Sequence, residues 1–276
     1  MNNKFAIGFI LYKPTNETID RIIEFSNLGF TIFIYDNDFS SSFENLFNDL
    51  NIKYYTKNKN VGLSIALHCL CLNAKLAGFH SLLYFDQDTF FNKKTILFIN
   101  EYLESLLNTQ YVSLGSVVCT TFRDLPLKHK TWNNINDISL NNKTLHSVYF
   151  TINSGSLYML DKFFNYNWFD HSYFVDGVDY AFCINSRKNN YMILEIYNVP
   201  GLDHDVEQGN DFVKLFGKIF RGRSYSFKRN LDFVGAHLKL ILKSFSLFSP
   251  KATLLLFKST TYYLITQLIF KTIKQK

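Results

Sequence analysis

The sequence predicts an α/β protein in which a mostly parallel sheet is flanked by helices. Short apolar runs typical of buried strands alternate with helical patterns, and the connections between them are short. Such continuous apolar runs are expected for parallel strands that are covered on both faces. The expected strands are 5–12, 30–35, 52–56 and the run that ends at Asp86, and the expected helices are 17–28 and 62–78.

Composition supports a folded chain with a full core. The 276 residues are 47% hydrophobic and 17% aromatic, which excludes a disordered protein. The four cysteines have neither metal-type spacing nor the density of a secreted disulfide framework, so we expect reduced thiols in a cytoplasmic protein. The N-terminal residues have no apolar export segment, and no export signal is expected.

Charge divides the chain into an acidic body, 1–211, and a basic tail, 212–276. The tail has thirteen Lys and Arg residues and a single acid, Asp232, whereas the body has 16 basic and 22 acidic residues. The tail also has a helical apolar stripe with basic residues around it: Leu254, Phe257, Leu264, Ile265, Leu268 and Ile269, with Lys258, Lys271, Lys274 and Lys276.

This combination predicts a helix that lies on an anionic bilayer, where each basic residue contributes about 1 kcal/mol. The run is too polar to predict a membrane span, because it is interrupted by Lys258, Thr260, Thr261 and Gln267. Nucleic acid is not an expected partner, because no recognition motif accompanies the basic residues. A solvated packing helix is the alternative interpretation.

Carboxylates follow two of the predicted strands. Asp86 and Asp88 end one apolar run, and Asp36, Asn37 and Asp38 end another. The carboxyl ends of strands are where open α/β sheets bind ligands, and two Asp side chains there suit Mg²⁺ or Mn²⁺ bridging a diphosphate. This pattern indicates a nucleotide-sugar enzyme, although Asp pairs also occur in ordinary turns and helix caps.

Four blocks in one order carry a family resemblance. They are 60–66 (NVGLSIA), 85–88 (FDQD), 153–156 (NSGS) and 174–179 (FVDGVD) with Arg187. Together they resemble family 2 glycosyltransferases of the GT-A fold, and most of all the bacterial rhamnosyltransferase-like branch, in which Asp-Gln-Asp is typical. The resemblance covers about residues 5–210.

The resemblance implies a binding site for a nucleotide-diphosphate sugar. Asp36 would accept a hydrogen bond from the pyrimidine ring, Asn37 would shape the turn, and Asn60 and Gly62 would let the backbone approach the nucleotide. Further binding residues implied by the resemblance are Tyr12, Asp86, Gln87, Ser154 and Gly155. For Ser154 and Gly155, a polar turn that enters the next apolar run is an equally good interpretation.

The resemblance also implies a metal site. Asp86 would lie near the ribose and the metal, and Asp88 would coordinate Mg²⁺ or Mn²⁺ between the two phosphates. His204 would add a third ligand or contact the diphosphate, with a purely structural histidine as the alternative.

Asp176 and Asp179 are the candidates for the catalytic base. In the family, an acidic residue here removes the proton from the acceptor hydroxyl, and the sugar transfers in one displacement with inversion. The two residues lie on one face of a predicted helix start, whose dipole is expected to keep both ionised. Gly177 stands where a second acid is often found, so either residue fits; Asp176 is favoured as the base, with Asp179 positioning or capping the helix.

These expectations combine into an inverting, metal-dependent glycosyltransferase that moves L-rhamnose from dTDP-rhamnose onto a lipid-linked or growing bacterial surface polysaccharide. It would lie at the cytoplasmic face of the cell membrane as a peripheral protein. The alternatives are a UDP-hexose or furanose donor, and a catalytically silent binding or scaffold protein of the same fold.

Overall fold

The computed structural model describes residues 5–38, 43–48, 50–90, 96–101, 117–123, 134–140, 143–162, 169–197, 203–204, 211–215, 218–222, 225–247 and 249–274. The chain forms two compact units, Met1–Leu202 and Asp203–Lys276. The sequence placed the boundary between its body and its tail at 211/212, within the second of these units.

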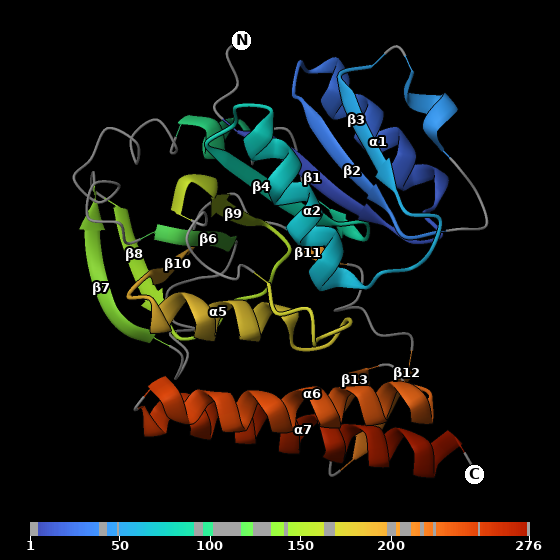
Figure 1. Cartoon of the computed structure of the whole chain (residues 1–276). Helices are drawn as coiled ribbons and strands as arrows, with labels where there is room; N and C mark the ends of the chain where they lie inside the picture. Colours follow the sequence, from blue (N-terminus) through green and yellow to red (C-terminus); the bar gives the residue numbers. More distant parts are fainter. Residues whose placement is uncertain are drawn as a thin grey trace. The chain divides into compact units, whose positions relative to one another are not determined.

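The first unit alternates strands and helices, as expected from the apolar runs (Figure 1). The helices whose bounds are described are α1 (Asn16–Asn27), α2 (Leu63–Leu76) and α5 (Val178–Lys188), with short 3-10 turns η1 (Glu44–Phe47) and η3 (Leu160–Lys162), and residues 96–101 are also helical. Its strands are β1 (Ala6–Leu11), β2 (Ile32–Asp36), β3 (Ile52–Thr56), β4 (Ser81–Asp86), β5 (Thr89–Phe90), β6 (Val117–Arg123), β7 (Asn134–Leu140), β8 (Lys143–Val148), β9 (Ser156–Met159) and β10 (Met192–Tyr197).

Nine of these strands form one sheet in the order β3-β2-β1-β4-β9-β6-β10-β8-β7. The strands β3, β2, β1 and β4 are parallel, and β6 is parallel to β10. The strands β9, β8 and β7 pair antiparallel with their neighbours. The predicted fold class, α/β with a largely parallel central sheet flanked by helices, is confirmed.

Both faces of the parallel half of the sheet are covered. Alternate side chains of a strand point to opposite faces, and Phe5, Ile7, Phe9 and Leu11 pack in one core with Ile19, Ile22 and Phe25 of α1. The helix α2 contacts β1, β2 and β4 through a second set of buried side chains that includes Ala66, Leu67 and Leu70. The strands β1, β2 and β4 are therefore buried on both sides, which explains their uninterrupted apolar sequences, whereas β3 lies at the edge of the sheet and is partly exposed.

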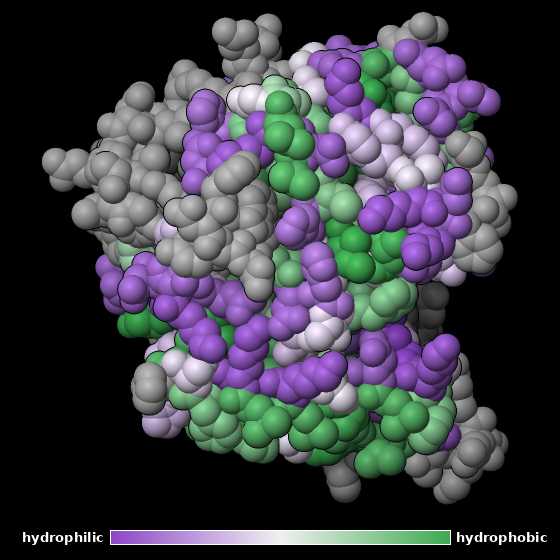
Figure 2. Space-filling view, in the orientation of Figure 1, coloured by the Kyte–Doolittle hydropathy of each residue, from purple (hydrophilic) through white to green (hydrophobic). Residues whose placement is uncertain are grey.

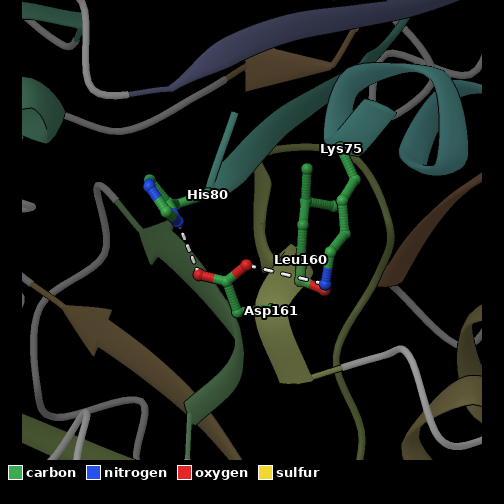
Figure 3. A network of polar contacts seen from close by, with 4 residues as sticks. All are labelled: Lys75, His80, Leu160 and Asp161. Atoms are coloured by element: carbon green, nitrogen blue, oxygen red, sulfur yellow. Dashed lines mark hydrogen bonds and ion pairs between the residues drawn. The ribbon is translucent and has the colours of Figure 1, made fainter. Parts of the chain in front are cut away.

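A polar network fastens the end of α2 to the turn after β9 (Figure 3). The ammonium of Lys75 donates to the carbonyl of Leu160 at 3.2 Å and lies 3.6 Å from Asp161, and the Nδ1 atom of His80 lies 2.6 Å from Asp161. His80 and Asp161 are largely exposed, so these ion pairs contribute little to stability. Their role is local: they surround a backbone hydrogen bond from Leu160 to His80.

The second unit contains two long helices, α6 (Phe227–Ser244) and α7 (Pro250–Lys274), joined by the 3-10 turn η5 (Phe245–Leu247). It also contains the short strands β11 (Asp203–His204), β12 (Asp211–Leu215) and β13 (Lys218–Gly222), of which β12 and β13 form an antiparallel pair. Among the residues that the structure describes, no helix is both long enough and apolar enough to cross a membrane.

Candidate functional site

Three parallel strands end at the same level in the first unit. Leu11 at the end of β1 is paired with Asp36 of β2, and Ile10 is paired with Asp86 of β4. The carboxylates of Asp36 and Asp86 therefore follow the strands on either side of β1, at the carboxyl edge of the sheet, where open α/β sheets bind their ligands.

The turn after β4 is fixed to the loop after β1 by Gln87. Its side-chain Oε1 accepts a hydrogen bond from the Tyr12 amide at 2.8 Å, and its Nε2 donates to the Tyr12 carbonyl at 3.0 Å. The backbone carbonyl of Gln87 accepts a hydrogen bond from Thr18, in the first turn of α1, at 3.0 Å. The amide group of Gln87 thus holds the protein's own backbone, and the ring of Tyr12 is exposed beside it.

Asp36 is buried and held on both oxygens. Its Oδ1 accepts a hydrogen bond from the Asp38 amide at 2.7 Å, and its Oδ2 accepts one from the hydroxyl of Tyr54. Burial raises the pKa of Asp36, and these two hydrogen bonds partly oppose that rise. Each carboxylate oxygen can accept a second hydrogen bond, so a ring N–H of a pyrimidine remains chemically compatible with this site.

Asn37 holds the segment before α2. Its Oδ1 accepts from the Val61 amide at 3.1 Å, and its Nδ2 donates to the Gly62 carbonyl at 3.4 Å. Asn60 adds a hydrogen bond from the Gly62 amide to its Oδ1 at 2.9 Å. The side chains of Asn37 and Asn60 therefore hold the backbone that leads into α2.

Gly62 is needed for a reason that the sequence did not reveal. It has φ of +82°, and a Cβ atom there would lie 2.7 Å from both the carbonyl oxygen and the ring of Phe174. The close approach at Gly62 is thus made by the protein's own loop, whereas the sequence interpretation assigned it to a nucleotide. The Leu63 amide donates to the Phe174 carbonyl at 2.6 Å, and Ser64 donates to the Tyr173 carbonyl at 2.7 Å, so the start of α2 holds the loop that leads to Asp176.

Asp86 is positioned by two neighbouring groups. The hydroxyl of Tyr84 donates to its Oδ1 at 2.6 Å, and its backbone amide donates to the hydroxyl of Ser154 at 3.0 Å. Ser154 also hydrogen-bonds with Thr89. The pKa of Tyr84 is raised by burial and then by the charges of Asp86 and Asp88.

The loop 153–156 packs directly against β4. The Gly155 amide donates to the Tyr84 carbonyl at 2.8 Å, with Gly155 at φ of +75°. The buried Asn153 accepts a hydrogen bond from the hydroxyl of Tyr158 at 2.8 Å. Ser154 and Gly155 therefore hold the backbone of β4 next to Asp86. The structure thus brings Ser154, Gly155 and Asp86 together.

Asp179 lies in the first turn of α5, which begins after Gly177 in the left-handed conformation. Its Oδ1 accepts a hydrogen bond from the Tyr180 amide at 2.9 Å. Burial raises the pKa of Asp179 to about 7, and the charges of Asp86 and Asp176 add to the rise. Burial and the two neighbouring carboxylates therefore oppose the helix dipole, which was expected to keep Asp179 ionised.

The carboxylates suit a metal that is shared with a ligand. Asp86 and Asp88 offer the hard oxygen donors that Mg²⁺ and Mn²⁺ prefer. In the described part of the chain, no group of three His, Cys, Asp or Glu side chains is arranged to hold a metal alone. Two carboxylates fit a cation whose other ligands are phosphate oxygens and water. The backbone of His204 lies in β11, and its side chain falls outside the described atoms.

Sequence reasoning missed three residues that build the site: Tyr54, Tyr84 and Phe174. The spacing of two residues between Tyr84 and Asp86 on one strand was the available signal for Tyr84, because such residues share a face. Tyr54 and Phe174 reach Asp36 and Gly62 from distant parts of the chain, and no local pattern marks them. Arg187, part of the family resemblance, donates to the Val148 carbonyl at 3.0 Å and ties α5 to β8.

Comparisons with known proteins support the fold. Neither protein-family models nor curated protein sequences give a match. Among solved structures, the chain is similar to S. aureus TarS, with a TM-score of 0.52, 13% identity and coverage of 87% of this chain and 39% of that one. It is also similar to GalNAc-T7 with UDP, GalNAc and Mn²⁺, with a TM-score of 0.52, 12% identity and coverage of 86% of this chain and 48% of that one.

Both of these proteins are glycosyltransferases of the GT-A fold, and this chain shares that fold. It spans less than half of the length of either protein. At this level of identity the likeness shows the architecture alone.

Proposed function

We propose that this chain is an inverting glycosyltransferase that moves a sugar from a nucleoside-diphosphate donor to a glycan or a lipid-linked glycan. The observation that carries the proposal is the position of Asp86 at the carboxyl end of β4, together with the raised pKa of Asp179 at the start of α5, to which burial contributes most and the charge of Asp86 adds. It supports the proposal that a candidate base lies close to the edge of the sheet where a diphosphate would bind. A silent scaffold of the same fold would have no need to bury a carboxylate close to two others.

The donor would bind across the carboxyl ends of β1, β2 and β4. Asp36 would accept the ring N–H of thymine or uracil while Tyr54 and Asp38 hold the carboxylate in place. We favour dTDP-L-rhamnose as the donor on the family resemblance, with UDP-hexoses and furanoses as alternatives that share the same ring N–H. Asp86 and Asp88 would hold Mg²⁺ or Mn²⁺, which stabilises the charge of the departing diphosphate when it is bound.

The transfer needs a carboxylate to take one proton. The acceptor oxygen attacks the anomeric carbon, its proton passes to the carboxylate of Asp176 or Asp179, and the bond to the diphosphate breaks on the opposite face. One displacement therefore inverts the configuration. A base works best when its pKa is close to the working pH, and the pKa of Asp179, about 7, meets that condition.

Release of nucleoside diphosphate from dTDP-rhamnose and UDP-sugars tests the proposal, with Mn²⁺ or Mg²⁺ and with water or a lipid-linked glycan as acceptor. We expect metal-dependent release by the wild type and a loss of about 100-fold or more in Asp88→Asn. Asp161→Asn is the matched control, because it removes an exposed carboxylate in the Lys75 network. Full metal-dependent release by Asp88→Asn would overturn the metal assignment, and no release from any donor would overturn the enzymatic function.

A further inference from the structure

The helices α6 and α7 form a hairpin that is locked by side chains along its length. At one end the Tyr225 amide donates to Gln267 at 3.0 Å, and Tyr263 donates to Asn230 at 2.7 Å. At the other end Ser244 and Thr253 hydrogen-bond at 2.9 Å. These contacts join the start of α6 to the end of α7, and the end of α6 to the start of α7, so the two helices are antiparallel.

Each helix of the hairpin carries a second apolar row that these contacts do not use. The rows consist of large exposed hydrophobic side chains: Phe227, Leu231, Leu238, Leu242 and Phe245 on α6 and its following turn, and Leu254, Phe257, Leu264, Ile265 and Leu268 on α7. Apart from the adjacent pair Leu264 and Ile265, successive members are spaced by three, four or seven residues, which puts each row on one face of its helix. Figure 2 shows hydrophobic side chains along α6 and α7. We call these two rows the hairpin stripe.

The two rows lie on the same side of the hairpin. The residues through which α6 contacts α7 are Asn230, Phe233 and Ser244, and those through which α7 contacts α6 are Thr253, Tyr263 and Gln267. In each helix, the exposed row is rotated about the helix axis away from these contact residues, and the sense of rotation, viewed along the chain direction, is the same in both. Because the two helices run in opposite directions, rows that are rotated in the same sense from the helix–helix contact lie on the same side of the hairpin. The hairpin stripe is therefore one continuous apolar surface, and its outermost members are exposed by 66% to 70%.

Basic side chains accompany the stripe. Lys228, Lys239, Lys251, Lys258 and Lys271 are exposed on the two helices, where Asp232 is the single acid in the sequence of both. An apolar surface with this charge complements an anionic bilayer, whose acyl chains accept the leucines and whose headgroups attract the lysines. A face that binds a second copy of the chain would bring these like charges together, which opposes association.

We propose that the hairpin stripe is a surface that docks on an anionic phospholipid bilayer, with α6 and α7 lying in the plane of the interface. This inference rests on the proposed function in one respect: docking would give the enzyme access to a lipid-linked acceptor. Vesicle binding is measured without donor or acceptor, so its failure is distinguishable from a failure of glycosyl transfer.

The test is cosedimentation of the full chain with vesicles of phosphatidylcholine alone or with phosphatidylglycerol. The stripe variant is Leu231→Ser, Leu242→Ser and Leu254→Ser, and its matched control is Leu46→Ser and Leu76→Ser, which removes leucines exposed elsewhere in the chain. We expect the wild type and the control to bind the anionic vesicles at least about tenfold more tightly than the stripe variant. All proteins are checked by thermal unfolding before the comparison.

The charge variant Lys239→Gln and Lys258→Gln is compared with Lys53→Gln and Lys188→Gln, which replace exposed lysines of the first unit. We expect the ratio of binding to anionic vesicles over binding to neutral vesicles to fall by about tenfold in the charge variant and to stay unchanged in its control. The proposal is overturned if the wild type does not bind anionic vesicles, or if the stripe variant binds them as the wild type does. A second copy of the chain would be the occupant instead if sedimentation velocity without vesicles shows a dimer of the wild type, the stripe variant does not form this dimer, and the wild type does not bind vesicles. That result would also overturn the proposal.

Discussion

The hydroxyl of Tyr84 donates a hydrogen bond of 2.6 Å to Oδ1 of Asp86, two residues further along the same strand. The bond fixes the orientation of a carboxylate that lies at the carboxyl edge of the sheet and whose charge reaches Asp179. The buried Tyr84 thus positions the side chain of Asp86, and Ser154 holds the backbone of Asp86.

Tyr84→Phe removes this hydrogen bond and keeps the shape of the core. We expect a loss of about 1–3 kcal/mol in the free energy of unfolding and a higher Mn²⁺ concentration for half-maximal activity, because Asp86 is no longer held. Urea titration and a Mn²⁺ dependence of turnover measure the two effects. Tyr35→Phe is the matched control: the hydroxyl of Tyr35 is buried without a hydrogen-bond partner in the described structure, so its removal is expected to be neutral or stabilising. Equal losses in both variants would contradict the positioning role of Tyr84.

Gly62→Ala places a methyl group against the backbone and ring of Phe174. We expect it to lower the free energy of unfolding by about 1–3 kcal/mol more than Gly78→Ala. Gly78 has φ of +91° and open space around it, so it reports the backbone strain alone. Urea titration of both variants gives the difference. Indistinguishable losses would show that the loop at Phe174 yields without cost.

The raised pKa of Asp179 has a consequence for stability. Between about pH 4 and pH 7 the folded protein keeps a proton on Asp179 that the unfolded chain has lost, so the unfolded state binds fewer protons. The contribution of Asp179 to stability therefore falls as pH rises through this window, by up to about 1.4 kcal/mol per pH unit. The difference in unfolding free energy between the wild type and Asp179→Asn, measured from pH 4 to pH 8, should show this fall. A difference that is constant over the range would contradict the raised pKa.

Asp176 and Asp179 can be separated by the pH dependence of turnover. If Asp179 is the base, Asp179→Asn abolishes turnover, whereas Asp176→Asn removes a neighbouring negative charge and shifts the acid limb of the profile to lower pH. If Asp176 is the base, as the sequence favours, Asp176→Asn abolishes turnover. Retention of wild-type activity and profile by both variants would rule out this pair as the source of the base.

The parallel half of the fold was predictable because its cause is local. Each of β1, β2 and β4 is buried on both faces, so an apolar run marks each of these strands, and the carboxylates at the ends of β2 and β4 mark the carboxyl edge of the sheet. The antiparallel half was not predicted, because the insertion of β9 between β4 and β6 depends on pairing between distant segments. Residues distant in the sequence also determine the properties of single residues. Phe174 leaves no space for a side chain at Gly62, and Asp86 helps to raise the pKa of Asp179.

The most direct test of the account is a thermal-shift panel of dTDP, UDP, GDP and CDP, each with and without Mn²⁺. A ligand at 100 times its dissociation constant stabilises a protein by about 2.7 kcal/mol, which is readily measured. We expect a Mn²⁺-dependent stabilisation that is largest for dTDP, with UDP next, and that is lost in Asp88→Asn and weakened for both pyrimidines in Asp36→Asn. Absence of stabilisation by every nucleotide, with and without the metal, would contradict the central claim that this sheet edge binds a nucleotide-sugar donor.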